Sequence, residues 1–207
     1  MKRILPVIHL IDEKTLFQNI ETCLECNINQ VFIINHITDY KDLLQKSLLV
    51  KNKYPEMWIG INCLDLHPQY ILNQDFNFDG VWIDQTLTLK DIENKKFRGE
   101  VFSGLNFKYQ KQFENEELKE MINLIKITSN IACTSGSGTG KEAPLEKIKN
   151  IKALLGDFPL ALASGVSVNN IESYLPYVNN FLVASSITDK NEVIDRVLLQ
   201  ELCFGIK

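Results

Sequence analysis

Short apolar stretches alternate with helical patterns eight times along the chain, and this alternation limits the fold more than any other feature. Strands that are apolar on both faces and separated by helices form a parallel sheet covered by helices. Eight repeats favour a closed (β/α)8 TIM barrel of the α/β class, and an open doubly wound sheet is the alternative. The expected strands cover residues 4–10, 31–34, 57–61, 80–83, 101–105, 131–134, 159–163 and 181–184.

Helix signals fill the segments between these strands. Asp12 and Asp39 each precede a pattern with apolar residues on one face, which is typical of capped amphipathic helices. Pro144 lies at the start of another pattern, where its missing N–H costs little. Further helices are expected after Pro68, from Val168 onward, and over residues 89–93, 114–126, 143–155 and 188–202.

The size and charge of the chain narrow the possibilities further. Its 207 residues fit one domain spanning residues 1–207, close to the lower limit of about 200 residues for a TIM barrel. A net charge of −4 gives no general attraction to nucleic acid. No apolar run approaches the ~18–20 residues of a membrane span. The expected partner is therefore a small molecule, while a homo-oligomer stays open.

Five cysteines are scattered through the apolar patterns, as expected of reduced thiols in a cytoplasmic protein. Cys23 and Cys26 form a lone C-x-x-C inside a helical pattern. Because a zinc site needs about four ligands, we expect no metal there. We also expect no cofactor.

Polar residues follow the strands at every expected strand end. In a TIM barrel these positions line one mouth, where active sites are built. Some of them, Asn35 and Ser164 above all, have the alternative role of capping helices or tying loops together. The positions are His9, Asn35 with His36, Asn62, Asp84 with Gln85, Asn106 with Lys108, Ser135, Ser164 and Ser185.

Two loops in the second half of the chain resemble phosphate-binding loops. TIM barrels often hold phosphate with the loops after strands seven and eight. Gly165 allows close backbone approach to an anion after Ser164, and Ser185 and Ser186 offer N–H and hydroxyl donors. A glycine is common where Ser185 stands. We expect phosphate to bind between these two loops.

A glycine-rich loop follows the sixth expected strand. It does not match the Walker A spacing, because Ser135 stands at the first glycine position and Glu142 follows Lys141. Its evenly spaced glycines also differ from the dinucleotide fingerprint. We expect the loop to cover the ligand with Lys141 reaching it, and a flexible connection is the alternative. Its residues are Ser135, Gly136, Ser137, Gly138, Thr139, Gly140 and Lys141.

Three stretches together resemble the BtpA family of phosphate-binding barrels. They are Pro6-Val7-Ile8-His9-Leu10, residues 134–141, and Ala163-Ser164-Gly165-Val166, and their order and spacing are similar too. The segment Ile11-Asp12-Glu13-Lys14 differs from the family's proline- and glycine-rich one. The resemblance implies a phosphate-binding TIM barrel, with family roles in photosystem assembly and in nucleoside or sugar-phosphate metabolism, but it implies no particular reaction.

The leading hypothesis is an enzyme acting on a sugar phosphate, a phosphoribosyl compound or a nucleotide-like molecule. Asp84 would serve as general acid or base, and His9 and His36 would move protons near neutral pH. Lys108 is a candidate Schiff-base nucleophile, with an ordinary surface lysine as the alternative. Asn62 and Asn106 would orient hydroxyl groups.

Two other functions stay open. A non-catalytic sensor or assembly factor is compatible with a mouth whose strand ends carry one carboxylate, Asp84. A metal-dependent hydrolase using His9, His36 and Asp84 is less favoured, because no paired metal-binding spacing supports it.

Overall fold

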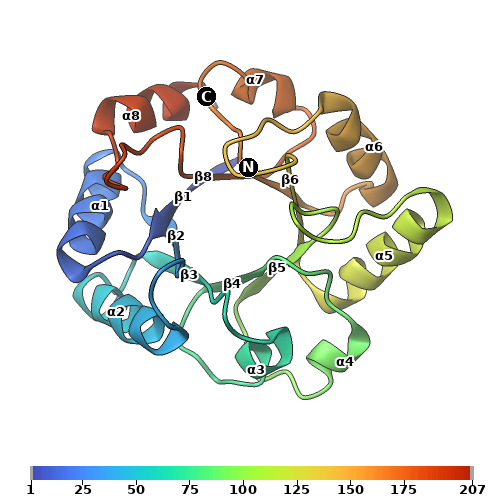
Figure 1. Ribbon diagram of the computed structural model, residues 1–207, viewed down its shortest axis with the longest axis horizontal. Helices are drawn as coiled ribbons and strands as arrows, with labels where there is room; N and C mark the ends of the chain where they lie inside the picture. Colours follow the sequence, from blue (N-terminus) through green and yellow to red (C-terminus); the bar gives the residue numbers. More distant parts are fainter. Residues whose placement is uncertain (1, 206–207) are drawn as a thin grey trace.

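Eight parallel strands form a closed barrel with eight helices around it in this computed structural model, which describes residues 2–205 (Figure 1). The strands pair in sequence order, and β1 pairs with β8 to close the barrel. The predicted (β/α)8 TIM barrel is confirmed, and an open sheet is excluded. The strands are β1 (Arg3–His9), β2 (Gln30–Ile34), β3 (Trp58–Asn62), β4 (Gly80–Ile83), β5 (Glu100–Gly104), β6 (Ile131–Ser135), β7 (Leu160–Ala163) and β8 (Asn180–Val183).

The helices alternate with the strands and vary widely in length. Asp12 and Asp39 cap the first two helices as predicted, each accepting a hydrogen bond from a backbone N–H in the first turn. The helices are α1 (Glu13–Glu25), α2 (Tyr40–Lys53), α3 (Pro68–Leu72), α4 (Leu89–Ile92), α5 (Asn115–Thr128), α6 (Leu145–Leu155), α7 (Ile171–Tyr174) and α8 (Arg196–Phe204).

The last helix begins later than the sequence predicted. The expected helix over residues 188–202 is wrong in its first half, because α8 starts only at Arg196. Asp189 is the physical reason: its carboxylate accepts hydrogen bonds from the N–H groups of Asn191 and Val193 at 2.8 and 2.9 Å, which turns the chain back on itself. Asp195 then caps the shortened helix.

Aromatic side chains fill the inside of the barrel beneath its mouth. The ring of Phe32 makes edge-on contacts with Trp58, Trp82 and Phe102, with ring centroids 5.1–5.8 Å apart. A second apolar layer packs between the strands and the surrounding helices. The two layers leave the barrel solid below the carboxyl ends of its strands.

A polar cluster lies at the opposite end of the barrel, where the strands begin. Arg3 donates from Nε to Asn180 Oδ1 at 2.6 Å and from Nη1 to Glu100 Oε2 at 2.8 Å. Its guanidinium also lies 5.5 Å from the ring centroid of Trp58. Arg3 therefore links β1, β5 and β8 beneath the aromatic core.

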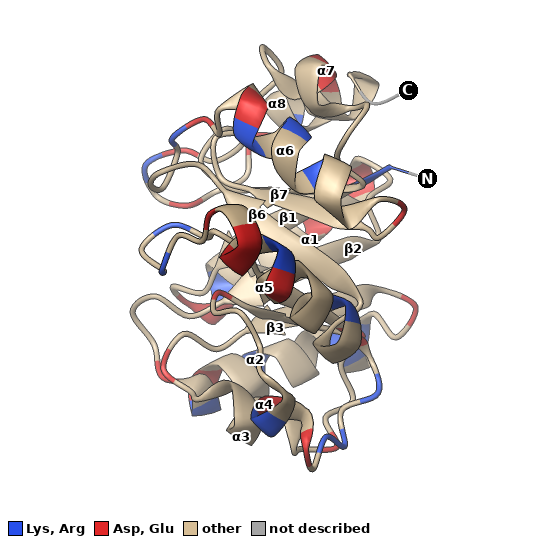
Figure 2. Cartoon of the chain, turned by 90° about the vertical axis from the view of Figure 1, so that its right-hand side faces the viewer, with Lys and Arg blue, Asp and Glu red and all other residues tan. Residues whose placement is uncertain are grey.

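Both ends of the described chain reach this same end of the barrel. The first strand, β1, starts there, and α8 runs back toward it from the mouth. Figure 2 shows that the described chain begins and ends on one side of the molecule, and that charged residues lie on helices and loops.

No helix within residues 2–205 is long and apolar enough to cross a membrane. No disulfide bond joins any two of the five cysteines within residues 2–205. Burial raises the pKa of Cys23, so this thiol of the C-x-x-C pair is poorly suited to bind zinc as a thiolate.

Candidate functional site at the barrel mouth

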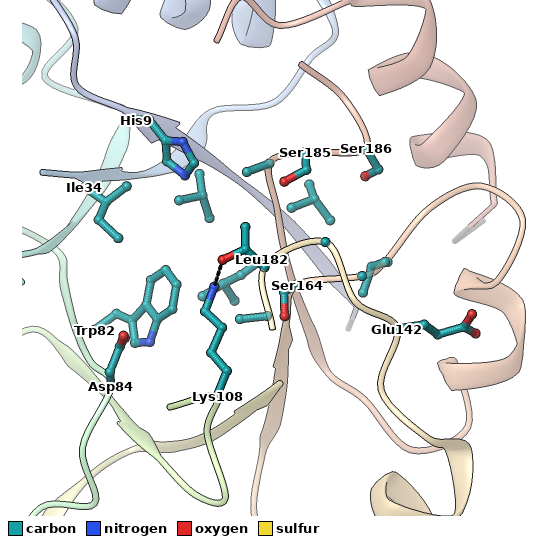
Figure 3. Close-up of a pocket in the computed structure, with 18 of the residues that line it drawn as sticks. His9, Ile34, Trp82, Asp84, Lys108, Glu142, Ser164, Leu182, Ser185 and Ser186 are labelled. Atoms are coloured by element: carbon teal, nitrogen blue, oxygen red, sulfur yellow. Dashed lines mark hydrogen bonds between the residues drawn. The ribbon is translucent and has the colours of Figure 1, made fainter. Parts of the chain in front are cut away.

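A cavity of about 500 Å3 opens at the carboxyl ends of the strands. Apolar side chains form its floor, among them Val7, Ile34, Trp82 and Leu182. Ten of the site residues predicted from the sequence line its walls (Figure 3). They are His9, His36, Asp84, Lys108, Thr139, Gly140, Ser164, Gly165, Ser185 and Ser186.

One wall consists of the loops after β7 and β8. Ser164 and Gly165 both have left-handed backbone conformations, with φ of 72° and 73°, which bend the chain sharply as it leaves β7. Asn170 holds this bend, because its Oδ1 accepts from the N–H of Ser167 at 2.9 Å and its Nδ2 donates to the carbonyl of Gly165 at 2.7 Å. The loop is thus fixed beside the cavity by an asparagine.

Several donors in these two loops have no protein acceptor. Within residues 2–205, the backbone N–H groups of Gly165, Ser185 and Ser186 make no hydrogen bond to another described residue. The hydroxyls of Ser164 and Ser186 are buried and likewise lack a partner among the described residues. Buried polar groups normally have hydrogen-bond partners, so this wall is suited to a ligand with several acceptor oxygens.

Asp84 stands on the facing wall, directly after β4 (Figure 3). Burial raises the pKa of Asp84, while the hydrogen bond from Asn62 Nδ2, 3.1 Å from Oδ1, and the charge of Lys108 offset part of the rise. Asn62 itself lines a second cavity of about 130 Å3 that also reaches Asp84. The carboxyl group therefore holds its proton to a higher pH than a free aspartic acid.

His9 and His36 meet at the top of the cavity. Their rings contact edge to face, with centroids 4.6 Å apart. Burial lowers the pKa of His36, and His9 and Lys108 lower it further, so His36 stays neutral at a pH where a free histidine is partly charged. His9 Nδ1 lies 3.0 Å from Glu192 Oε2.

Lys108 reaches across the mouth toward the glycine-rich loop. Its Nζ donates to Thr139 Oγ1 at 3.0 Å, the bond dashed in Figure 3. Burial lowers the pKa of a different lysine, Lys147 on α6, to about 8. Lys147 does not line the cavity and donates to the carbonyls of Asn106 and Ser135, which joins the ends of β5 and β6.

Other predicted site residues support the loops and do not line the main cavity. Asn106 exchanges two hydrogen bonds with the backbone of Phe113, at 2.7 and 2.9 Å. The fully buried Ser135 hydroxyl accepts from the N–H of Lys108 at 2.7 Å. The residues away from the main cavity are Asn62, Asn106, Ser135, Gly136, Ser137, Gly138 and Lys141.

The glycine-rich loop folds onto itself and onto the loop after β7. A Cβ at Gly136 would lie 2.0 Å from the carbonyl oxygen of Lys141, and a Cβ at Gly165 would lie 2.2 Å from that same oxygen. Two glycines from different loops therefore enclose one peptide group. This packing attaches the loop that carries Thr139 to the loop that carries Ser164.

Several residues at or near the cavity were not predicted from the sequence. Trp82 lines the floor, and its buried indole N–H has no acceptor among the described residues. Its position two residues before Asp84 was an available signal, because alternate strand residues share one face. Glu192 was hidden inside the helix expected over residues 188–202. Glu142 also lines the cavity, but its carboxylate turns away and accepts from the Tyr174 hydroxyl at 3.3 Å (Figure 3).

Solved structures similar to this chain share its fold. A native structure of a protein called KDPGal has a TM-score of 0.70 and 12% identity, covering 97% of this chain and 91% of its own. A protein from Aquifex aeolicus VF5 has a TM-score of 0.71 and 15% identity, covering 100% and 93%. A designed porous protein cage has a TM-score of 0.71 and 12% identity, covering 98% and 70%. At these identities the likeness establishes the fold alone.

No curated protein matches the sequence. The model of the BtpA family matches residues 79–202, which is more than half of the chain. The match includes β4, β7, β8 and the glycine-rich loop. It confirms the resemblance identified from the sequence motifs, and the chain belongs to the BtpA family.

Proposed function

We propose that this protein binds a phosphorylated small molecule at the barrel mouth and acts on it by acid–base chemistry. The observation that carries the proposal is the wall of unpaired donors formed by Gly165, Ser185 and Ser186. A phosphate group offers several acceptor oxygens at once, and TIM barrels commonly hold phosphate between the loops after strands seven and eight.

Charge in the cavity supports the same ligand. Among the described residues that line the cavity, Lys108 is the only lysine, and none is an arginine. Glu142 also lines the cavity, but its carboxylate points away toward the Tyr174 hydroxyl (Figure 3). An anion at the loops therefore meets donors and a cation.

Asp84 and the two histidines lie where they would reach the rest of such a ligand. Figure 3 shows Asp84 across the cavity from Ser164, so a phosphate at the loops would leave the ligand's other end near the carboxyl group. General acid–base catalysis is most efficient when the pKa of the catalytic group lies near the working pH. The raised pKa of Asp84 is a change in that direction. The phosphate would supply binding energy remote from the reacting atoms. Sugar phosphates and phosphoribosyl compounds have suitable hydroxyl and carbonyl groups.

Calorimetric titration with inorganic phosphate and a panel of sugar phosphates tests the binding site. Ser185→Asp places a carboxylate among the donors, and we expect it to weaken phosphate binding at least tenfold. Asn150→Asp adds the same charge to the exposed face of α6 and serves as the matched control. Equal affinities in both variants and in the parent protein would exclude the proposed site.

A non-catalytic phosphometabolite sensor of the BtpA type is the second candidate. It is favoured by the fact that Asp84 is the one strand-end carboxylate at the mouth among residues 2–205, with its Oδ1 bonded to Asn62. Chromatography of the protein incubated with each compound detects turnover. A compound that binds tightly and is recovered unchanged would favour the sensor over the enzyme.

A further inference from the structure

The connection between β8 and α8 forms a folded-back segment, residues 188–194, that lies against α1. Thr188 and Ile194 pair in antiparallel fashion, and the N–H of Asp189 donates to the carbonyl of Val193 at 2.9 Å. Glu192 sits at the turn with a φ of 60°. This backbone places the Glu192 carboxylate against His9 at the end of β1, although the two residues are far apart in sequence.

Asn19 fastens this segment to the barrel. The residue is fully buried on α1, and both ends of its amide are used: Nδ2 donates to the carbonyl of Glu192 at 2.8 Å, and Oδ1 accepts from the N–H of Ile194 at 2.8 Å. Satisfied buried amides are costly to disrupt. The position of Glu192 is therefore set by the fold.

Glu192 meets His9 through one particular ring nitrogen. His9 Nδ1 lies 3.0 Å from Glu192 Oε2, and a carboxylate can only accept a hydrogen bond. A proton on Nδ1 avoids the repulsion between two lone pairs at this distance, and it leaves Nε2 of neutral His9 as a base. Figure 3 shows the His9 ring projecting into the cavity from the end of β1.

We propose that Glu192 is a positioning residue that fixes His9 in the Nδ1–H form, so that Nε2 exchanges a proton with the ligand. The proposal rests on the acid–base function proposed above. When Nε2 takes a proton from a ligand C–H or O–H group, the electron pair of that bond stays on the ligand. The imidazolium that forms keeps its Nδ1 proton beside the Glu192 carboxylate. Return of the proton restores neutral His9.

This arrangement would give the cavity two proton-transfer groups on different walls. Asp84 stands after β4 and His9 at the end of β1, with His36 in edge contact with the His9 ring. The segment that holds Glu192 begins at residue 188, two residues after Ser186. The connection between β8 and α8 would thus supply Ser185 and Ser186 to the phosphate and Glu192 to His9.

Nitrogen-15 spectra that correlate the ring nitrogens of histidine with its carbon-bound protons report the tautomer without any ligand. The chain has three histidines, and His36→Gln and His67→Gln assign the signals. At about pH 8.5, where imidazole is neutral, we expect His9 in the Nδ1–H form. His67 is an internal reference for the opposite form, because its Nδ1 accepts from the N–H of Gln69.

Variants separate the role of Glu192 from a general effect on folding. Glu192→Ala should return His9 to mainly the Nε2–H form, while Glu192→Gln, whose amide oxygen still accepts, should keep the Nδ1–H form. Glu201→Ala removes a carboxylate from the exposed face of α8 and should change nothing at His9.

An Nε2–H signal for His9 in the parent protein would overturn the proposal, even if the variants failed to fold. The same holds if Glu192→Ala folds and leaves an Nδ1–H signal unchanged. Neither result would affect phosphate binding at Ser185, so failure here is distinguishable from failure of the proposed function. With a substrate in hand, Glu192→Ala should lower kcat more than it raises KM.

Discussion

Asp84 combines a position at the barrel mouth with a cost to the fold. Its carboxyl group is largely buried at the end of β4, and burial raises its pKa despite the hydrogen bond from Asn62. The folded protein therefore holds this proton to a higher pH than the unfolded chain does. Ionisation of Asp84 consequently lowers stability as the pH rises through the raised pKa.

Asp84→Asn removes that cost and keeps an acceptor for Asn62. At pH 7 we expect the variant to be more stable than the parent by about 1 kcal/mol. Below the ordinary aspartate pKa of 3.8 both states are protonated and the difference should vanish. Urea unfolding at several pH values measures it. Asp75→Asn, at an exposed position, is the control, and an equal gain there would contradict the explanation.

Individual residues also show how far the sequence predicts the site. Residues that follow the strands were expected at one mouth, because in a closed parallel barrel all carboxyl ends share a face. His9, His36, Asp84, Ser164 and Ser185 do line one cavity. A position at the end of a strand does not determine the direction of the side chain. Asn106 therefore lies at the expected end of the barrel, but its amide bonds to the backbone of Phe113 instead of lining the cavity.

At the scale of single elements, the loops were harder to predict than the strands. Apolar runs mark buried strands directly, and the structure places all eight where they were expected within a residue or two. The segment before α8 instead depends on one side chain, Asp189, which redirects the backbone by local hydrogen bonds. Periodicity cannot distinguish such a turn from the first turns of a helix.

The glycine-rich loop gives a direct test at this scale. Gly140 and Gly165 have similar left-handed backbones, with φ of 68° and 73°, but a Cβ meets nothing within 4 Å at Gly140 and meets the Lys141 carbonyl at Gly165. Gly140→Ala should cost about 1 kcal/mol of conformational strain. Gly165→Ala should cost at least about 2 kcal/mol more, because two loops must separate. Thermal and urea unfolding compare the two, and equal losses would refute the packing argument.

For the molecule as a whole, closure of the barrel brings the two ends of the sequence together. Arg3 pairs in register with Asn180, and its side chain also bonds to Glu100. These contacts join segments that are far apart in the chain, beneath an aromatic core. The alternation of elements predicts closure, but only the folded barrel reveals which side chains secure it.

Arg3→Met keeps the apolar stem and deletes both side-chain hydrogen bonds. Because Asn180 is buried and loses its partner, we expect a loss of about 1–3 kcal/mol in the free energy of unfolding. Arg98→Met, at an exposed position, should change stability by less than about 0.5 kcal/mol. A loss at Arg98 as large as at Arg3 would show that overall charge, and not the cluster, is responsible.

Both ends of the described chain lie on one side of the barrel, and this has a practical meaning. An affinity handle or a support attached where the described chain begins or ends, at residues 2 or 205, would sit on the side opposite the carboxyl ends of the strands (Figure 2). Every immobilised molecule would then present the mouth to the solution. A library of phosphorylated compounds can therefore be passed over tethered protein, with the anchor on the far side of the barrel from the ligands being tested.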